Sequence, residues 1–263
     1  MKKKERPRSK EMKKKCWAGS LNDCNGKISR EHIITKALSE EELTISGFPW
    51  MSGIQRKMRL YDLCSHILCE KHNTDLSKFD SEVVNLQKIF EEITLQEKRF
   101  AQPGFGYRNN ADPIVYRVNG HYLERWFCKT LVNVVMVDPT YKDLQYQPIL
   151  EYIYGDKNFE EPYGLYTDAT IGQMQYLDFL SVLPIFGKPN NLTGACFIIK
   201  GVGFRLQIPS TSFSIAKLDE DRFITDFDIN GNLTKKQLNW HNKKIQYAFN
   251  GKVRQTIVFE WKD

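Results

Sequence analysis

Residues 16–38 read CWAGSLNDCNGKISREHIITKAL and residues 68–80 read LCEKHNTDLSKFD. The first stretch holds two cysteines in a run rich in Gly, Asn and Ser, followed by a Glu-His-Ile step. The second holds a cysteine and a histidine and runs directly into a helical pattern. Two cysteine-bearing loops that flank a short strand and a helix predict a small, metal-stapled unit in the first third of the chain.

The spacing of these residues favours a tetrahedral zinc site, which usually takes its thiolate and imidazole ligands as two short-spaced pairs. Two residues separate Cys69 from His72, the usual spacing, whereas seven separate Cys16 from Cys24. We expect these four residues to hold a structural Zn²⁺. Nearby competitors for a ligand position are Cys64 and His66. The alternative is that Cys69 and Cys64 are buried thiols and His72 is a surface residue.

The composition predicts a folded chain that does not enter a membrane. Hydrophobic residues make up 41% and aromatic residues 13%, as in folded domains. No apolar stretch approaches a membrane span, and none follows the basic N-terminus as in a secretory signal. We therefore expect a cytoplasmic protein, in which clustered cysteines bind metal rather than form disulfides. Cys128 and Cys196 lie in apolar runs and are expected to be core thiols.

The basic residues concentrate in an arm at the N-terminus. Residues 1–15 carry a net charge of +7, whereas the whole chain carries +6, so the remaining 248 residues sum to −1. Such an arm either binds the phosphates of a nucleic acid or remains a solvated tail. Because it adjoins the metal-stapled unit, we favour a nucleic acid, DNA in particular, as the partner.

Three residues near the cysteines fit the chemistry of phosphodiester hydrolysis. The reaction needs a base that activates water and a divalent cation that neutralises charge on the phosphate. His32 is a suitable base near neutral pH. Glu31 and Asn73 offer the oxygen ligands that Mg²⁺ or Mn²⁺ prefers. An isolated Glu-His pair is more often a surface dipeptide, and on a regular strand its two side chains would point to opposite faces.

The periodicity of the chain predicts an α+β fold. Apolar residues step by three or four along one helical face from Leu76 to Ile93, after Asn73, which can cap the helix. Further expected helices cover 36–43, 121–137 and 233–249, and expected strands cover 27–34, 113–118, 195–200, 204–208 and 253–261. We place a boundary after Lys98, which gives a basic arm at 1–15, a metal-stapled domain at 16–98 and an α+β domain at 99–263 for targeting, regulation or assembly.

The arrangement resembles the HNH nucleases of the ββα-metal (His-Me finger) class, in their zinc-stapled form, over roughly residues 16–85. The residues that carry the resemblance are Cys16, Cys24, 29–34, 68–73 and 76–77. In that class an acidic-His-Ile step lies on the first hairpin, and a helix that begins with Asn or His supplies the last metal ligand. The resemblance implies an endonuclease with His32 as general base and with Glu31 and Asn73 holding the catalytic cation. It also implies a role in bacterial or phage (antiviral) defence.

The chain departs from that pattern in several places. His72 stands where the zinc-binding members usually have a second cysteine. The middle Asn of the pattern is not evident, and Asp62 or Ser65 could take its place. Ser77 could complete the cation site. The long span before Cys69 implies an insertion around residues 47–57.

These departures leave other functions open. The chain could be a zinc-finger protein that binds nucleic acid without cleaving it. Alternatively, residues 99–263 could carry the activity, or could mediate a homodimer or a protein partner.

Overall fold

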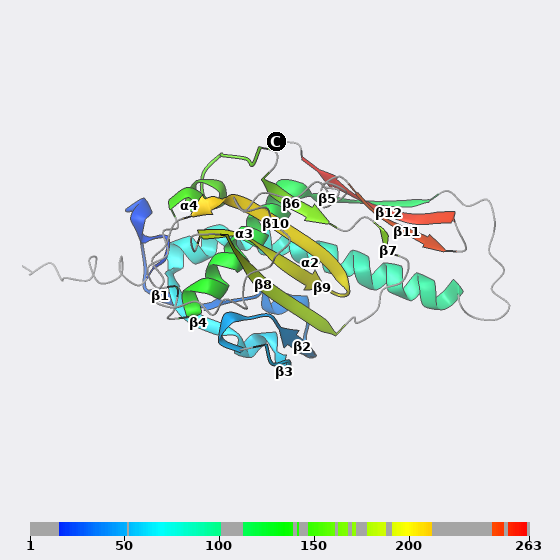
Figure 1. Ribbon diagram of the computed structural model, residues 1–263, viewed down its shortest axis with the longest axis horizontal. Helices are drawn as coiled ribbons and strands as arrows, with labels where there is room; N and C mark the ends of the chain where they lie inside the picture. The colour runs from blue at the N-terminus through cyan, green and yellow to red at the C-terminus, as the bar shows by residue number, and fades with distance from the viewer. Residues whose placement is uncertain are drawn as a thin grey trace, which may run out of the picture.

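The chain folds into an α+β structure, as its periodicity predicts (Figure 1). The computed structural model describes residues 16–51, 53–100, 113–138, 141, 147–160, 163–167, 170–171, 178–187, 191–211, 244–249 and 252–261. The predicted basic arm lies outside these residues, as does the first part of the helix predicted at 233–249. None of the described helices has the length and apolar character needed to cross a membrane.

The N-terminal part contains a strand pair followed directly by a helix. Strands β1 (Ile28–His32) and β4 (Cys64–Cys69) form a two-stranded antiparallel sheet, and helix α2 (Glu70–Phe100) begins at the next residue. The sequence predicts a helix start at Asn73, and the helix begins three residues earlier, at Glu70. The ladder shifts register between Ser29 and Glu31, as in a β-bulge. Such a bulge re-aims the side chains that follow it.

A long insertion separates the two strands of this pair. Its elements are η2 (Lys36–Leu38), β2 (Glu42–Ser46), η3 (Pro49–Met51), β3 (Arg56–Arg59) and η4 (Leu60–Asp62). The helix predicted at 36–43 is therefore wrong beyond its first turn. Leu43 and Ile45 are buried and alternate with more exposed neighbours, which is the period of a strand.

Strands from both halves of the chain form a six-stranded sheet in the order β3-β2-β8-β9-β10-β6. The later strands are β6 (Gly164–Thr167), β8 (Phe179–Gly187), β9 (Asn191–Ile199) and β10 (Val202–Thr211). The predicted hairpin of residues 195–208 lies in β9 and β10. Strand β2 pairs in parallel with β8, with Ile45 opposite Leu180. The two parts that the sequence separated after Lys98 thus share one sheet.

A second, four-stranded sheet has the order β5-β12-β11-β7. Its strands are β5 (Ile114–Asn119), β7 (Thr170–Ile171), β11 (Lys244–Phe249) and β12 (Lys252–Glu260). The helix predicted over 233–249 is wrong for its described residues, which form β11. Ile245 and Tyr247 are buried on one side, so packing against the core selects the strand.

Helix α3 (Gly120–Val137) lies between α2 and the six-stranded sheet (Figure 1). Asn119 caps it by accepting a hydrogen bond from the backbone amide of Tyr122. Phe127 packs against Phe197 and Phe204, with ring centroids 4.6 and 5.1 Å away. The short helix α4 (Gln147–Ile153) packs beside α3. Buried residues from both halves of the chain form one hydrophobic core.

Candidate metal centre and neighbouring polar residues

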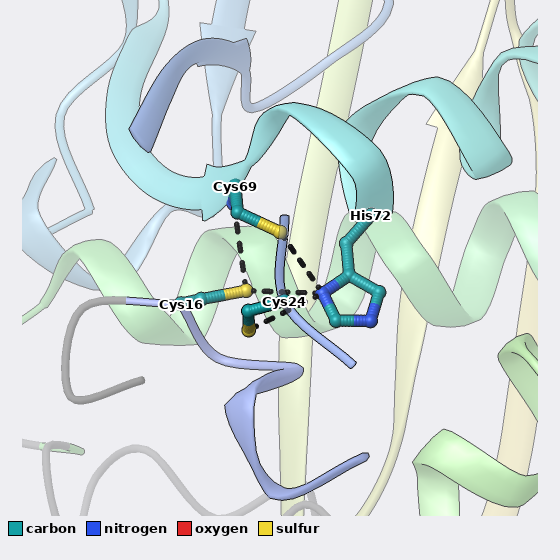
Figure 2. A group of neighbouring side chains, drawn as sticks. All are labelled: Cys16, Cys24, Cys69 and His72. Atoms are coloured by element: carbon teal, nitrogen blue, oxygen red, sulfur yellow. Dashed lines mark hydrogen bonds between the residues drawn. The ribbon is translucent and has the colours of Figure 1, made fainter. Parts of the chain in front are cut away.

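Three cysteines and one histidine converge where the strand pair meets α2, and this group could bind a metal ion (Figure 2). Cys16 and Cys24 lie in the loop that precedes β1, Cys69 ends β4, and His72 lies in the first turn of α2. Their potential ligand atoms all lie within 4.8 Å of one another. Among the residues that the structure describes, these are the ones that form such a group.

The distances within the group fit a tetrahedral site. The Nδ1 atom of His72 lies 3.4 Å from the sulfur of Cys16, 3.7 Å from that of Cys24 and 3.2 Å from that of Cys69. Ordinary Zn–S and Zn–N bond lengths give a sulfur–nitrogen edge of about 3.6 Å in a tetrahedron. The three sulfur–nitrogen distances are therefore close to those around a bound Zn²⁺, with Nδ1 as the imidazole ligand.

The other ring nitrogen of His72 meets a carboxylate that the sequence did not single out. His72 is fully buried, and its Nε2 lies 2.8 Å from Oδ1 of Asp23. Lys71 lies 2.7 Å from the other carboxylate oxygen. Lys71 and His72 both lower the pKa of Asp23, so the carboxylate is charged and accepts a hydrogen bond from Nε2–H of His72. This contact directs Nδ1 toward the cysteines, as carboxylates do behind metal-bound histidines.

Backbone contacts bring the cysteine loop onto the start of α2. The amide of Glu70 donates to the carbonyl of Lys27, and the amide of Trp17 donates to the carbonyl of Ile67. Gly26 has a φ of +78°, and a Cβ atom there would lie 2.2 Å from a carboxylate oxygen of Glu70. A glycine is therefore required between Cys24 and β1.

Burial makes the thiols hard to ionise without a cation. Desolvation raises the pKa of Cys16 to about 12, and the neighbouring thiols add to the effect. Desolvation also raises the pKa of Cys24. A bound divalent cation reverses this tendency, because a coordinating thiol is deprotonated.

His32 ends β1 and lies against an exposed tyrosine. Its ring centroid is 5.8 Å from that of Tyr61. The side chain is half-buried, and burial lowers its pKa, with the cations Lys36 and Arg30 adding to the effect. The backbone of Leu60 acts in the opposite direction. The imidazole is therefore neutral near pH 7, the form that a general base needs.

Glu31 points into the core and binds residues of α3. Its Oε1 atom lies 3.0 Å from Nζ of Lys129 and accepts a hydrogen bond from Nδ2 of Asn133 at 3.2 Å. Glu31 is 3% exposed and Lys129 is 2% exposed. Burial raises the pKa of Glu31, and Lys129 opposes that shift. The Oε2 atom takes part in neither contact.

Lys129 also binds a second carboxylate, that of Asp80 on α2. Its Nζ atom lies 2.9 and 3.0 Å from the two oxygens of Asp80. Thr35 donates to Asp80 at 2.5 Å and accepts from the indole of Trp126 at 2.7 Å. Burial lowers the pKa of Lys129, but Glu31 and Asp80 outweigh it and raise the pKa overall. We call Glu31, Lys129, Asp80 and Asn133 the buried ion cluster.

Asn73 and Ser77 lie on the exposed side of the first turns of α2. The Nδ2 atom of Asn73 donates to Oγ of Ser29 on β1 at 3.0 Å. Ser77 instead donates to the carbonyl of Thr74 in its own helix. The two residues proposed in place of the middle Asn lie apart: Asp62 is exposed in η4, whereas Ser65 pairs opposite Glu31 in the β1–β4 ladder.

The sequence contains a pattern that indicates buried polar roles for Lys129 and Asn133, and hydrophobic periodicity alone does not reveal it. Both lie in the helical run FCKTLVNVV, residues 127–135, and are the residues in it that are neither apolar nor small. A lysine and an asparagine one turn apart in such a run predict buried polar side chains that need partners.

The chain matches no family model, no curated protein and no solved structure. The contacts and donor sets of its own residues are therefore the basis for assigning a function.

Proposed function

We propose that the chain is a metal-dependent endonuclease of the HNH type, with a zinc staple and a separate catalytic cation. Cys16, Cys24 and Cys69 as thiolates, with Nδ1 of His72, would hold the Zn²⁺ that fixes the loop before β1 to the start of α2. His32 would act as the general base on the same small unit. The substrate is a nucleic acid, DNA in particular, and the expected location is the cytoplasm.

One contact carries the proposal more than any other. The side chain of Asn73 reaches across from α2 to Ser29, which lies three residues before His32 on β1. The amide nitrogen of Asn73 is used in that contact, so its Oδ1 is the atom that could face a cation. The helix residue and the strand of the base are thereby held together, as a strand–strand–helix nuclease site requires.

The chain's own residues would divide the work of hydrolysis. His32, neutral at pH 7, would take the proton of the attacking water. Lys129 and Asn133 fix Oε1 of Glu31, so Oε2 is the oxygen that would bind the cation together with Oδ1 of Asn73. A bound Mg²⁺ or Mn²⁺ would supply charge stabilisation at the scissile phosphate. Such a site cuts one strand at a time.

Nicking of supercoiled plasmid tests this proposal. Purified protein is incubated with plasmid, with and without Mg²⁺ or Mn²⁺, beside His32→Ala and the matched control His66→Ala. His66 is an exposed histidine on the neighbouring strand β4. Cation-dependent nicking by the wild type and His66→Ala, with a loss of at least about 100-fold in His32→Ala, supports the proposal. Nicking that survives in His32→Ala contradicts it.

The buried ion cluster favours a second candidate, a zinc-stapled protein that binds nucleic acid without cleaving it. Lys129 already neutralises Glu31, so a cation at Glu31 would meet a nearby ammonium group. Under this candidate the wild type and His32→Ala bind DNA equally, and neither cuts it in Mg²⁺ or Mn²⁺. A wild type that nicks plasmid through His32 excludes it.

A further inference from the structure

We propose that the sugar–phosphate backbone of the substrate lies along strand β3 and reaches His32 past Arg30. This inference rests on the proposed function and names the surface that would hold the nucleic acid. Strand β3 carries Arg56, Lys57 and Arg59, which we call the cationic row. All three side chains are exposed.

The cationic row has no charged partner in the part of the chain that the structure describes. The segment from Ile54 to Leu60 contains three cations and no acidic residue. The acidic residue closest in register is Glu42, which lies opposite Arg59 in the β2–β3 ladder and forms no ion pair with it. Exposed and unpaired cations on an edge strand suit contacts with phosphates.

Strand geometry gives two of the three cations a common side and gives the whole row an open edge. Lys57 and Arg59 lie opposite Thr44 and Glu42, so both project from one face of the sheet. Arg56, the first residue of β3, lies opposite buried Ile45 and projects from the other face. Strand β3 is also the edge of the six-stranded sheet. Its outward backbone amides can therefore add hydrogen bonds to phosphate oxygens.

Arg30 continues the row to His32. Its guanidinium lies 4.7 Å from the ring centroid of Tyr61 and donates to the hydroxyl and carbonyl of that residue at 3.2 and 3.3 Å. It also donates to the sulfur of Cys64 at 2.7 Å. These contacts fix an exposed cation over the same tyrosine that contacts His32. Lys36 is also exposed, and Lys36 and Arg30 both lower the pKa of His32 by their charge.

Cations on an edge strand have a second known role, because they prevent edge-to-edge pairing of sheets. That role would not make the affinity for nucleic acid depend on these residues. Salt dependence separates the two, since each phosphate contact with duplex DNA contributes about 0.9 to the slope of log K against log salt.

The test measures binding by fluorescence anisotropy with a labelled DNA duplex and an RNA duplex of the same sequence. The full-length chain carries His32→Ala throughout, so the probe is not cut. The row variant is R56A/K57A/R59A. The matched control is K88A/K98A/R99A, which removes the same charge from exposed positions in the C-terminal half of α2. We expect the row variant to weaken binding roughly tenfold or more and to reduce the salt slope by about 2 to 3. The control should change the slope by less than about 1.

Each outcome decides one of the two proposals. An unchanged affinity and slope in the row variant overturn the surface, as does an equal loss in the control. If the wild type nicks plasmid and the row variant with His32 restored nicks it equally well, the proposed binding surface is wrong and the nuclease proposal stands. If the salt slope depends on the row but the wild type does not cut plasmid, the proposed binding surface is supported and the nuclease proposal is contradicted. The better-bound duplex identifies the class of nucleic acid.

Discussion

The cysteine–histidine group and the buried ion cluster both join the region of β1 to a helix, but they satisfy their charges differently. Around Nδ1 of His72 the described part of the chain supplies three sulfur donors, and no lysine or arginine in that part contacts them. Around Glu31 and Asp80 it supplies Lys129, whose ammonium lies within about 3 Å of both carboxylates. The first group needs an external cation for its thiolate form, and the second carries an internal one. Charge balance therefore requires a bound metal in the cysteine–histidine group, whereas Lys129 provides it in the buried ion cluster.

The strongest test of this comparison is Cys69→Ser. A serine hydroxyl is a poor zinc ligand, so we expect the bound zinc to fall from one per chain to nearly none. Because the site ties the cysteine loop to α2, the unfolding free energy should fall by several kcal/mol, on the order of 5. Metal analysis and chemical denaturation measure the two effects. Cys64→Ser is the matched control on the same strand and should keep one zinc; its loss of zinc would assign the ligands differently.

The internal cation is tested by Lys129→Met, which leaves Glu31 and Asp80 without their shared partner. Removing one member of a buried ion pair costs about 3 to 5 kcal/mol. Adding Glu31→Gln to this variant should recover part of the loss, because fewer uncompensated charges then remain buried. Urea denaturation of the wild type and of the single and double variants measures the coupling. Losses that simply add in the double variant would show that Lys129 and Glu31 do not act as a pair.

A smaller effect is expected from Asp23→Asn, which weakens the contact behind His72 without removing a ligand. Outer carboxylates of this kind typically change metal affinity by about 10- to 100-fold. We expect zinc affinity to fall within that range, and stability at saturating zinc to change little. Competition with a chromogenic chelator measures the affinity. Asp75→Asn is the control, since Asp75 also binds Lys71 but does not contact His72.

Glu124 shows a third way to avoid an unbalanced buried charge, because its carboxyl group stays protonated up to a higher pH. Burial raises its pKa to about 8, although the amide of Leu165 donates to it at 2.7 Å. A raised pKa means that the folded chain binds more protons than the unfolded one between the ordinary value of 4.5 and about 8. Stability contributed by this group is therefore present below that window and lost as the pH rises through it.

Glu124→Gln should remove that dependence, which is at most about 1.4 kcal/mol per pH unit. Denaturation curves between about pH 5 and pH 8 compare the variant with the wild type. A wild-type slope that the variant retains in full would assign the pH dependence to other groups.

Much of this arrangement could be predicted from local sequence, and the rest depends on distant partners. The spacing of Cys69 and His72 and the apolar stripe of α2 are short-range patterns, and both predicted what the structure contains. The prediction of a helix for residues 244–249 is wrong. Their strand conformation depends on pairing with β12 and β7, which the local sequence does not reveal. The contacts of Glu31 depend on α3, which no spacing near residue 31 reveals. The contact between Asp23 and His72 likewise joins residues that lie 49 positions apart.

The contact between Glu31 and Asn133 joins residues that lie 102 positions apart in the chain. A ribosome adds roughly 5 to 20 residues per second, so α3 emerges on the order of 5 to 20 s after β1. During that interval the carboxylate of Glu31 has neither of its partners from α3, and its side chain is not yet held in place. A nascent chain is therefore unable to complete the region around His32 until residues from both halves of the chain have met.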